Sequence, residues 1–341
     1  MDISRLHVLL VSSTPSLTWL ATGCLNRVGI KPSLLTSTDF RLPRLLRRTR
    51  VHESFHPADA TGHADDDLGA YSERLVARVE DFCRRHKVDV VLPVDLRCIL
   101  PMGEHWQSDA PARLFPVAAP VDIRLLHDKW HFSTLCKERG LPQPASELIA
   151  RDEDIDALPL RYPIVVKPLN RANSAGIYRL DSAPAVHAHL RSGLPFSAPP
   201  LLAQEFIPGR DMGCSLLADR GEIKAFTIFR QYKLGRAFTE HAGIEAMARE
   251  LVSAMRFHGI GHIDLREDRR DRSAKLFEIN PRVWGSILYS ARAGVNFLEL
   301  GIRQTLGEDI ATVFKPLRPR WVRVSARDRL GNRINELMSR R

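Results

Sequence analysis

An alternation of buried strands and amphipathic helices over the first 118 residues constrains the fold of this chain more than any other feature. Residues 6–11 are mainly apolar and are predicted to form a strand, and a helix is predicted over 14–28. Apolar residues then recur at helical spacing over 68–83, and the apolar run 88–93 follows. This order of elements predicts a parallel α/β unit over residues 1–118. No G-x-G-x-x-G motif follows the first strand, so the pattern does not indicate a dinucleotide site.

Beyond this unit the pattern changes to a capped helix and then to a strand-rich region. Asp128 is a suitable N-cap for a helix from Lys129 to Arg139, which Gly140-Leu141-Pro142 would end. The later residues favour strands joined by turns, with one more helix near 243–258. The expected strands are 163–167, 200–206, 212–219, 222–230, 261–265 and 274–278. The chain is therefore expected to combine a parallel α/β part with α+β parts.

Composition limits the class of protein. With 341 residues, of which 44% are hydrophobic, the chain can bury a sizeable core and form two or three structural units. No apolar run approaches the roughly 18 residues of a membrane helix, and the N-terminus lacks the apolar core of a signal peptide. The five cysteines are scattered without C-x-x-C spacing, which argues against a disulfide framework or a zinc site. A reducing, cytoplasmic location is therefore expected.

Arginine carries most of the net charge of +10, with clusters at 41–50 and after residue 316. Basic clusters can bind nucleic acid, but acidic residues are interspersed elsewhere in this chain. No basic helix carries base-reading or stacking residues. The composition therefore favours a solvated arginine-rich surface, or a site for anionic substrates, over a nucleic-acid partner.

The segment Glu278-Ile279-Asn280-Pro281-Arg282 carries the most specific chemical signal. Period-2 geometry places Glu278 and Asn280 on one face of a strand, and a charged turn connects this strand to an earlier one that contains Asp264. Three oxygen-bearing side chains brought together in this way suit Mg²⁺. Arg282 then follows the strand end, where its fork of donors could hold a phosphate or a carboxylate. The alternative is an ordinary solvated face of a hairpin.

A lysine at the exit of an apolar strand is a candidate phosphate ligand. Lys167 follows the apolar run 162–166 and precedes Pro168, which is expected to stop the strand. An ammonium group there needs an anion, although such lysines commonly only extend their charge into solvent. The next loop, 169–176, is rich in small and polar residues and ends at Gly176. It could turn backbone N–H groups toward a phosphate, or be an ordinary hairpin loop.

A further strand, within residues 201–211, is broken by Pro208-Gly209. A broken strand frees backbone N–H and C=O groups, which could pair with the edge of an adenine. Asp211 lies just past the break and could accept hydrogen bonds from ribose hydroxyls. The alternative is a strand that ends in a turn with an exposed acid.

The order of these parts is more specific than any one of them. A capped helix with Lys129, a strand-end Lys167, a small-residue loop, the Q-E-F-I-P-G hinge, Asp264 and E-x-N-P-R follow one another. In this order the chain resembles the ATP-grasp superfamily, which includes D-alanine–D-alanine ligase, biotin carboxylase and the large chain of carbamoyl-phosphate synthetase. The match covers about residues 1–310. It implies an α/β and α+β fold with four parts: an N-terminal α/β (pre-ATP-grasp) domain, 1–118; a central (lid) subdomain, 119–205; a C-terminal subdomain, 206–315; and an arginine-rich tail, 316–341.

The resemblance also implies roles for individual residues. Arg282, facing the acyl phosphate, and Lys167 would be catalytic, and Mg²⁺, or Mn²⁺ in its place, would be held by Asp264, Glu278 and Asn280. Backbone groups of the hinge would bind adenine, and Asp211 would bind ribose. The implied ATP-binding residues are Lys129, Lys167, Ser174, Gly176, Gln204, Glu205, Phe206, Ile207 and Asp211. The phosphate loop departs from the family pattern, since it has a single glycine together with Arg171, Asn173 and Ser174.

The implied function is that of an ADP-forming, ATP-dependent ligase that joins a carboxylate to an amine through an acyl phosphate. Two alternatives are an ATP-binding protein of this fold without ligase activity and a kinase-like enzyme without ligation. The expected partners are small-molecule carboxylate and amine substrates, without a membrane, and a homodimer is left open. An acidic substrate would suit the basic residues near the site. The substrate-contact candidates are Arg230, Tyr232, Lys233, Arg236, Trp284 and Ser286.

Overall fold

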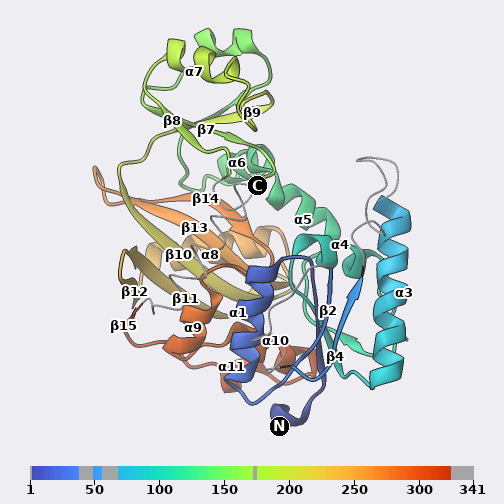
Figure 1. The fold of residues 1–341 in the computed structure, drawn as a ribbon. Helices are drawn as coiled ribbons and strands as arrows, with labels where there is room; N and C mark the ends of the chain where they lie inside the picture. The colour runs from blue at the N-terminus through green and yellow to red at the C-terminus, as the bar shows by residue number, and fades with distance from the viewer. Residues whose placement is uncertain (1, 38–48, 56–67, 172–174, 324–341) are drawn as a thin grey trace.

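The computed structural model of the chain describes residues 2–37, 49–55, 68–171 and 175–323. These residues form three β-sheets with helices packed against them (Figure 1). No helix within these ranges is both long enough and apolar enough to cross a lipid bilayer.

The first sheet is the parallel sheet that the sequence predicts. Its part of the chain comprises η1 (Ile3–Arg5), β1 (Val8–Ser12), α1 (Pro15–Asn26), β2 (Ser33–Ser37), β3 (His52–Phe55), α3 (Leu68–His86), β4 (Val90–Pro93), α4 (Leu96–His105) and β5 (Arg113–Leu114). The strand order is β3-β2-β1-β4-β5, and every neighbouring pair is parallel. Pro15 begins α1, a position where its missing N–H has no helical partner to lose.

The second sheet belongs to a lobe at the top of Figure 1, which we call the upper lobe. Two helices lead to it, α5 (Pro120–His127) and α6 (Lys129–Glu138), and Asp128 caps α6 as predicted by accepting from the N–H groups of Trp130 and His131. The upper lobe contains β6 (Ser146–Ile149), η3 (Asp152–Ala157), β7 (Ile164–Pro168), β8 (Tyr178–Leu180), α7 (Ala183–Leu190) and β9 (Leu201–Glu205). Its strands are antiparallel in the order β6-β9-β7-β8.

The third sheet is the largest and is antiparallel throughout. It comprises β10 (Gly209–Asp219), β11 (Glu222–Tyr232), β12 (Gly235–Thr239), β13 (Gly259–Asp268), β14 (Ala274–Asn280) and β15 (Arg320–Arg323), with α8 (Ala242–Ala254), α9 (Ile287–Ala293), α10 (Phe297–Thr305) and α11 (Ile310–Val313). The strand order is β14-β13-β10-β11-β12-β15. The predicted hairpin is confirmed as β13 and β14, with Asp264 opposite Glu278 and His262 opposite Asn280.

Two acids that were expected in the solvated turn of this hairpin are buried instead. Glu267 and Asp268 are 6% and 1% exposed and form the end of β13. Arg272 pairs with Glu267 at 3.0 Å, and Arg270 pairs with Asp268 at 2.6 Å. Burial of these carboxylates is therefore accompanied by the charge pairing that buried acids require.

The faces of the first sheet are covered by different parts of the chain. Leu9 and Val11 of β1 pack under α3, whereas Val8 and Leu10 point to the opposite face. That opposite face shares one apolar core with α1, α9 and α10. Asn296, the N-cap of α10, donates a hydrogen bond of 2.9 Å to the carbonyl of Cys24 in α1. The beginning and the end of the described chain are thus joined through one core.

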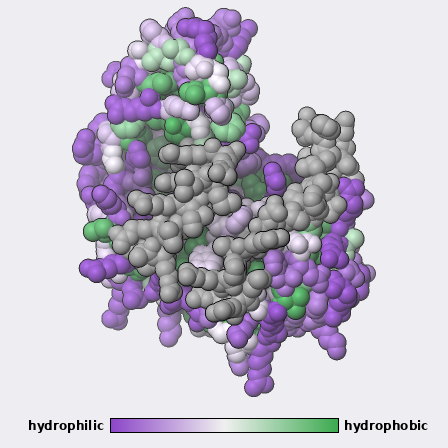
Figure 2. All heavy atoms as spheres, viewed as in Figure 1, coloured by the Kyte–Doolittle hydropathy of each residue, from purple (hydrophilic) through white to green (hydrophobic). Residues whose placement is uncertain are grey.

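The face of the molecule seen in Figure 2 is largely hydrophilic, with apolar side chains gathered on the upper lobe. The exposed apolar side chains of the upper lobe include Ile177, Leu194 and Phe196, which are 44%, 48% and 40% exposed. The Arg171 guanidinium lies over the Phe196 ring at 4.6 Å.

Candidate active site

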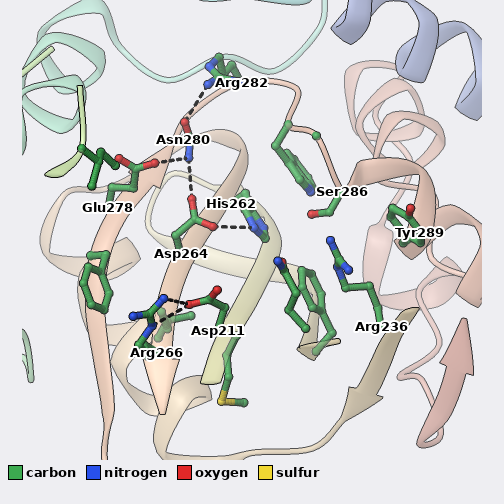
Figure 3. A pocket seen from close by; sticks show the side chains of 18 of the residues that line it. Asp211, Arg236, His262, Asp264, Arg266, Glu278, Asn280, Arg282, Ser286 and Tyr289 are labelled. Carbon is green, nitrogen blue, oxygen red and sulfur yellow. Dashed lines mark hydrogen bonds and ion pairs between the residues drawn. The ribbon is translucent and has the colours of Figure 1, made fainter. Parts of the chain in front are cut away.

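A cleft of about 530 Å³ is lined by residues of α1, of the upper lobe and of the third sheet. The upper lobe contributes β7 and β9, and the third sheet contributes β10 to β14 and the segment that leads into α9. Figure 3 shows side chains that line this cleft. Of the residues predicted to be catalytic or to bind ATP or the metal, seven line it: Lys167, Gln204, Asp211, Asp264, Glu278, Asn280 and Arg282.

The three predicted metal ligands lie together on one wall of the cleft (Figure 3). The Asn280 amide nitrogen donates to Asp264 Oδ2 at 3.0 Å and to Glu278 Oε1 at 3.4 Å. Two carboxylates that accept from one NH₂ group converge on a single point. Oxygen donors that converge in this way fit a hard divalent cation. The described residues hold no cluster of three or more His, Cys, Asp or Glu side chains with metal-site geometry, so the candidate set depends on the amide.

The Asn280 side chain connects this acidic pair to Arg282. Its Oδ1 accepts from Arg282 Nη2 at 2.9 Å, so that the amide oxygen faces the arginine and the NH₂ group faces the acids. Half a turn of the amide would present its oxygen to a cation. Arg282 is held a second time, because its Nη1 donates to the Val283 carbonyl at 2.8 Å. Burial lowers the pKa of Arg282, while Glu278 opposes that shift.

Asp264 is charged more readily than an ordinary aspartate. Burial alone would raise its pKa, but the neighbouring His262 and further hydrogen-bond and charge contacts outweigh this and hold the pKa below its usual range. His262 Nε2 lies 3.4 Å from Asp264 Oδ1. The Asp264 side chain keeps 45% of its surface accessible, so its carboxylate faces the cleft rather than the core.

The two predicted phosphate-binding lysines have different environments. Lys167 is 4% exposed, and its Nζ donates to Gln204 Oε1 at 2.9 Å. Burial without a carboxylate in contact lowers the pKa of Lys167 to about 8. Lys129 is 6% exposed, and its Nζ contacts the Arg171 carbonyl at 2.5 Å and Glu278 Oε2 at 3.4 Å. Lys129 is not among the described residues that line the cleft.

The predicted hinge is confirmed as the break between β9 and β10. Its backbone already has partners within the protein: the Glu205 N–H donates to the Ala145 carbonyl at 2.8 Å, and the Ile207 carbonyl accepts from Arg266 at 3.2 Å. The Phe206 N–H makes a longer bond of 3.4 Å to Pro163.

The structure supports the predicted ribose-binding and phosphate-loop residues less directly than the metal ligands. Asp211 lines the cleft, but its Oδ1 accepts from Arg266 Nε at 2.7 Å and pairs with Nη2 at 2.6 Å. Gly176 has φ +72°, and a Cβ there would approach Phe196 to 2.9 Å, so this position needs glycine. Ser174 lies outside the described residues, as does Asn173.

His262 is a cleft residue that the sequence analysis missed. Its ring is stacked between Phe229 and Trp284, with centroids at 5.7 and 5.4 Å and interplanar angles of 13° and 8°. Its Nδ1 shares a hydrogen bond of 2.9 Å with the Ser215 hydroxyl. His262 precedes Asp264 by two residues in β13, so strand alternation could have placed it on the same face.

Only one of the four basic or aromatic residues expected near the β11–β12 turn reaches the cleft, and that residue is Arg236. Arg230 lies 3.4 Å from Glu267 instead, and Tyr232 packs against Arg210 and Trp321. Trp284 and Ser286, which were expected to contact substrate, both line the cleft.

A comparison with protein families gives a match over residues 197–325, which contain β9 and the whole third sheet. The matching family is described as "ATP-grasp in the biosynthetic pathway with Ter operon". The chain is also 27% identical over 203 residues to a D-alanine–D-alanine ligase of Halorhodospira halophila, covering 53% of this chain and 66% of the relative. A D-alanine–D-alanine ligase B of Chromobacterium violaceum is 31% identical over 94 residues, 27% of this chain and 31% of the relative. The chain therefore spans less than two thirds of each of these relatives.

Solved structures share the fold over most of the chain. An L-amino acid ligase from Bacillus licheniformis has a TM-score of 0.67 at 17% identity and covers 92% of this chain and 78% of its own. A biotin carboxylase from Campylobacter jejuni has a TM-score of 0.64 at 12% identity, with coverage of 90% and 72%. The fold class expected from the sequence is thus confirmed. The family match over residues 197–325 and the shared fold together support the resemblance of the chain to the ATP-grasp superfamily.

Proposed function

We propose that this protein is an ADP-forming ligase that phosphorylates a carboxylate with ATP and joins the resulting acyl phosphate to an amine. One observation carries the proposal: Asp264, Glu278 and Asn280 converge on the wall of a cleft that Lys167 and Arg282 also line. Transfer of a γ-phosphoryl group to a carboxylate brings two anions together, so positive charge must be positioned between them. Five residues that supply oxygen ligands and fixed cations in one cleft suit that requirement.

The metal would be held by Asp264, Glu278 and the amide oxygen of Asn280. When bound, Mg²⁺ would neutralise charge on the phosphate oxygens. Without the metal, Asn280 keeps the two carboxylates within reach of one another through its NH₂ group. Metal binding would replace these two hydrogen bonds, because the amide would turn its oxygen toward the cation. His262 lies 3.4 Å from Asp264 and helps to hold the pKa of that carboxyl group below its usual range.

Lys167 and Arg282 would serve different stages of the reaction. Lys167 is oriented by Gln204, which is itself fixed by donating to the Ser146 hydroxyl at 2.9 Å. We assign Lys167 to the phosphates of ATP, since a buried ammonium that lacks an anion in contact gains most from one. Arg282 is held by Asn280 and Val283, which leaves its charge beside the metal ligands. We assign it to the oxygens on which charge develops during transfer.

The remaining assignments of the ATP site are part of the same proposal. The hinge 204–207 would receive the adenine, Asp211 the ribose, and Lys129, Ser174 and Gly176 the phosphates. Asp211 would have to share or release Arg266 to do so, because both of its contacts there are shorter than 2.8 Å. The names of the relatives and of the L-amino acid ligase above favour amino acids as the first substrates to test.

The proposal is tested by measuring ADP, phosphate and pyrophosphate release from ATP with a panel of amino acids and carboxylic acids, each with and without an amine. Acid-dependent release of ADP is expected, with a ligated product when the amine is present. Hydroxylamine traps an acyl phosphate as a hydroxamate, so hydroxamate without ligation would identify the kinase-like alternative. Stoichiometric pyrophosphate would contradict γ-phosphoryl transfer. Glu278→Gln should remove the activity, whereas Glu222→Gln, at an exposed position at the start of β11, is the matched control.

A further inference from the structure

Arg236 lies on the side of the cleft away from Glu278, next to Ser286 and Tyr289 (Figure 3). It belongs to β12, where it is paired in register with Gln231 of β11. Gly235 precedes it, and a Cβ at Gly235 would meet the Val322 carbonyl at 2.5 Å. The close packing of β15 on this turn therefore fixes the backbone from which the Arg236 side chain enters the cleft.

Arg236 is partly buried, and its guanidinium has no anion in contact among the described residues. Its Nη1 makes two long hydrogen bonds, of 3.4 and 3.2 Å, to the carbonyls of Tyr232 and Gly235. Its Nε is buried and has no hydrogen-bond partner. Across the described ranges, no carboxylate lies within ion-pair distance of this group. Arg266, another cleft arginine, contrasts with it, since two of its nitrogens bind Asp211.

Two aromatic rings of the described chain face this charge. The guanidinium carbon lies 5.6 Å from the Phe229 ring centroid and 5.1 Å from that of Tyr289. Burial lowers the pKa of Arg236, as expected of a cation removed from water. A buried charge and an unpaired donor both carry an energetic cost, which a bound anion would reverse.

We infer that Arg236 binds a second, non-reacting carboxylate of the substrates, at the opposite side of the cleft from the Asp264–Glu278 pair. This inference rests on the proposed function, which assigns Arg282 to the reacting end. Arg236 and Arg282 are the two cleft arginines that, within the described chain, have no ion pair. The rings of Phe229, Trp284 and Tyr289 line the same cleft and suit a short hydrocarbon chain that connects the two carboxylates. The second carboxylate belongs either to the acid or to the amine.

The test compares substrates that differ only in this group. For the amine arm, alanine is compared with alaninamide. For the acid arm, succinate is compared with its monomethyl ester, and glutamate with glutamine. Each pair is assayed for ADP release with wild-type protein, Arg236→Gln and Arg236→Lys. Arg249→Gln is the control, because Arg249 is an exposed arginine of α8 that forms an ion pair with Glu245 and does not line the cleft. Binding of the same compounds is measured by calorimetry with a non-hydrolysable ATP analogue and Mg²⁺.

In one arm, wild-type protein is expected to prefer the compound with the extra carboxylate by about 100-fold or more in kcat/KM. Arg236→Gln should remove that preference and leave the KM for ATP unchanged, and Arg236→Lys should restore part of it because lysine keeps the charge without the fork. Which arm responds identifies the substrate that carries the group. Thermal unfolding of each variant shows whether it is folded.

The failure of this inference can be told apart from failure of the proposed function. Equal use of both members of every pair, unchanged by Arg236→Gln, would overturn the role of Arg236 while leaving the ligase activity in place. If no acid stimulates ADP release, the proposed function falls. In that case calorimetry still tests the role of Arg236. Loss of carboxylate binding in Arg236→Gln would support this role, and unchanged binding would overturn it.

Discussion

Replacing Lys167 by methionine should make the ligand-free protein relatively more stable at neutral pH than at high pH. Lys167 is a buried ammonium whose hydrogen-bond partner, the Gln204 amide, is neutral. In the absence of ATP, folding places a charge where only a phosphate would balance it. Methionine has a similar shape and no charge, so the substitution removes the free-energy cost of burying the charge.

The size of the effect follows from the lowered pKa of Lys167, about 8 in the folded protein against 10.5 for an ordinary lysine. The folded state then binds its proton less tightly than the unfolded state, and the charge costs about 3 kcal/mol at pH 7. The cost is fully present below pH 8 and is relieved as the pH rises toward 10.5. The loss of a donor to Gln204 offsets part of the gain, by roughly 1–3 kcal/mol at every pH.

Urea unfolding of the wild-type protein and of Lys167→Met, at pH 7 and at pH 9.5, measures this difference. The free energy of unfolding of the variant relative to wild type should fall by about 2 kcal/mol between the two pH values. Lys129→Met is the matched comparison, because Lys129 is equally buried but contacts Glu278, and it should lower stability at pH 7. A pH-independent difference for Lys167→Met would refute the argument that the buried charge is uncompensated.

Three further substitutions test the site. Glu278→Ala should abolish acid-dependent ADP release at low millimolar Mg²⁺ while leaving the protein folded, although the loss of the carboxylate that contacts buried Lys129 should lower the midpoint of urea unfolding; normal turnover would rule out the metal assignment. Arg282→Ala should lower kcat by roughly 10²–10³ with little effect on the KM for ATP, and the reverse pattern in steady-state kinetics would make it a ground-state ligand. Gly213→Ala should destabilise the protein by about 1–3 kcal/mol in urea unfolding, because a Cβ there would approach the rings of Phe229 and His262 to 2.5 and 2.6 Å; an unchanged midpoint would show that the stack can move.

Local patterns in the sequence were sufficient to predict the elements and the acidic end of the cleft. The β13–β14 hairpin follows from two short apolar strands around a charged turn, and strand alternation places Glu278 and Asn280 together. The buried strand that ends at Pro168 was predicted in the same way, as was the cap at Asp128. In each case, neighbours in the sequence decide the structure.

The opposite side of the cleft could not be predicted, because residues far apart in the sequence create it. His262 is distinctive only because Phe229 and Trp284 stack on its two faces. Arg236 was one of four candidates on one turn, and the sequence cannot show that Arg230 turns to Glu267 while Arg236 enters the cleft. The hinge was found from Pro208-Gly209, but not the partners of its backbone groups. The division of the chain into domains stays a prediction.

The shared core of the first sheet has a consequence for how the chain is made. The face of β1 that carries Val8 and Leu10 is completed by α9 and α10, which are about 280 residues farther along the chain. Domains that emerge early from the ribosome normally fold first. Here the apolar face of β1 cannot be covered until nearly the whole polypeptide has been synthesised. A fragment that ends at residue 118 would expose the same face permanently. We expect such a fragment to aggregate when produced alone, and to become soluble when residues 283–302 are supplied by co-expression of the remainder of the chain.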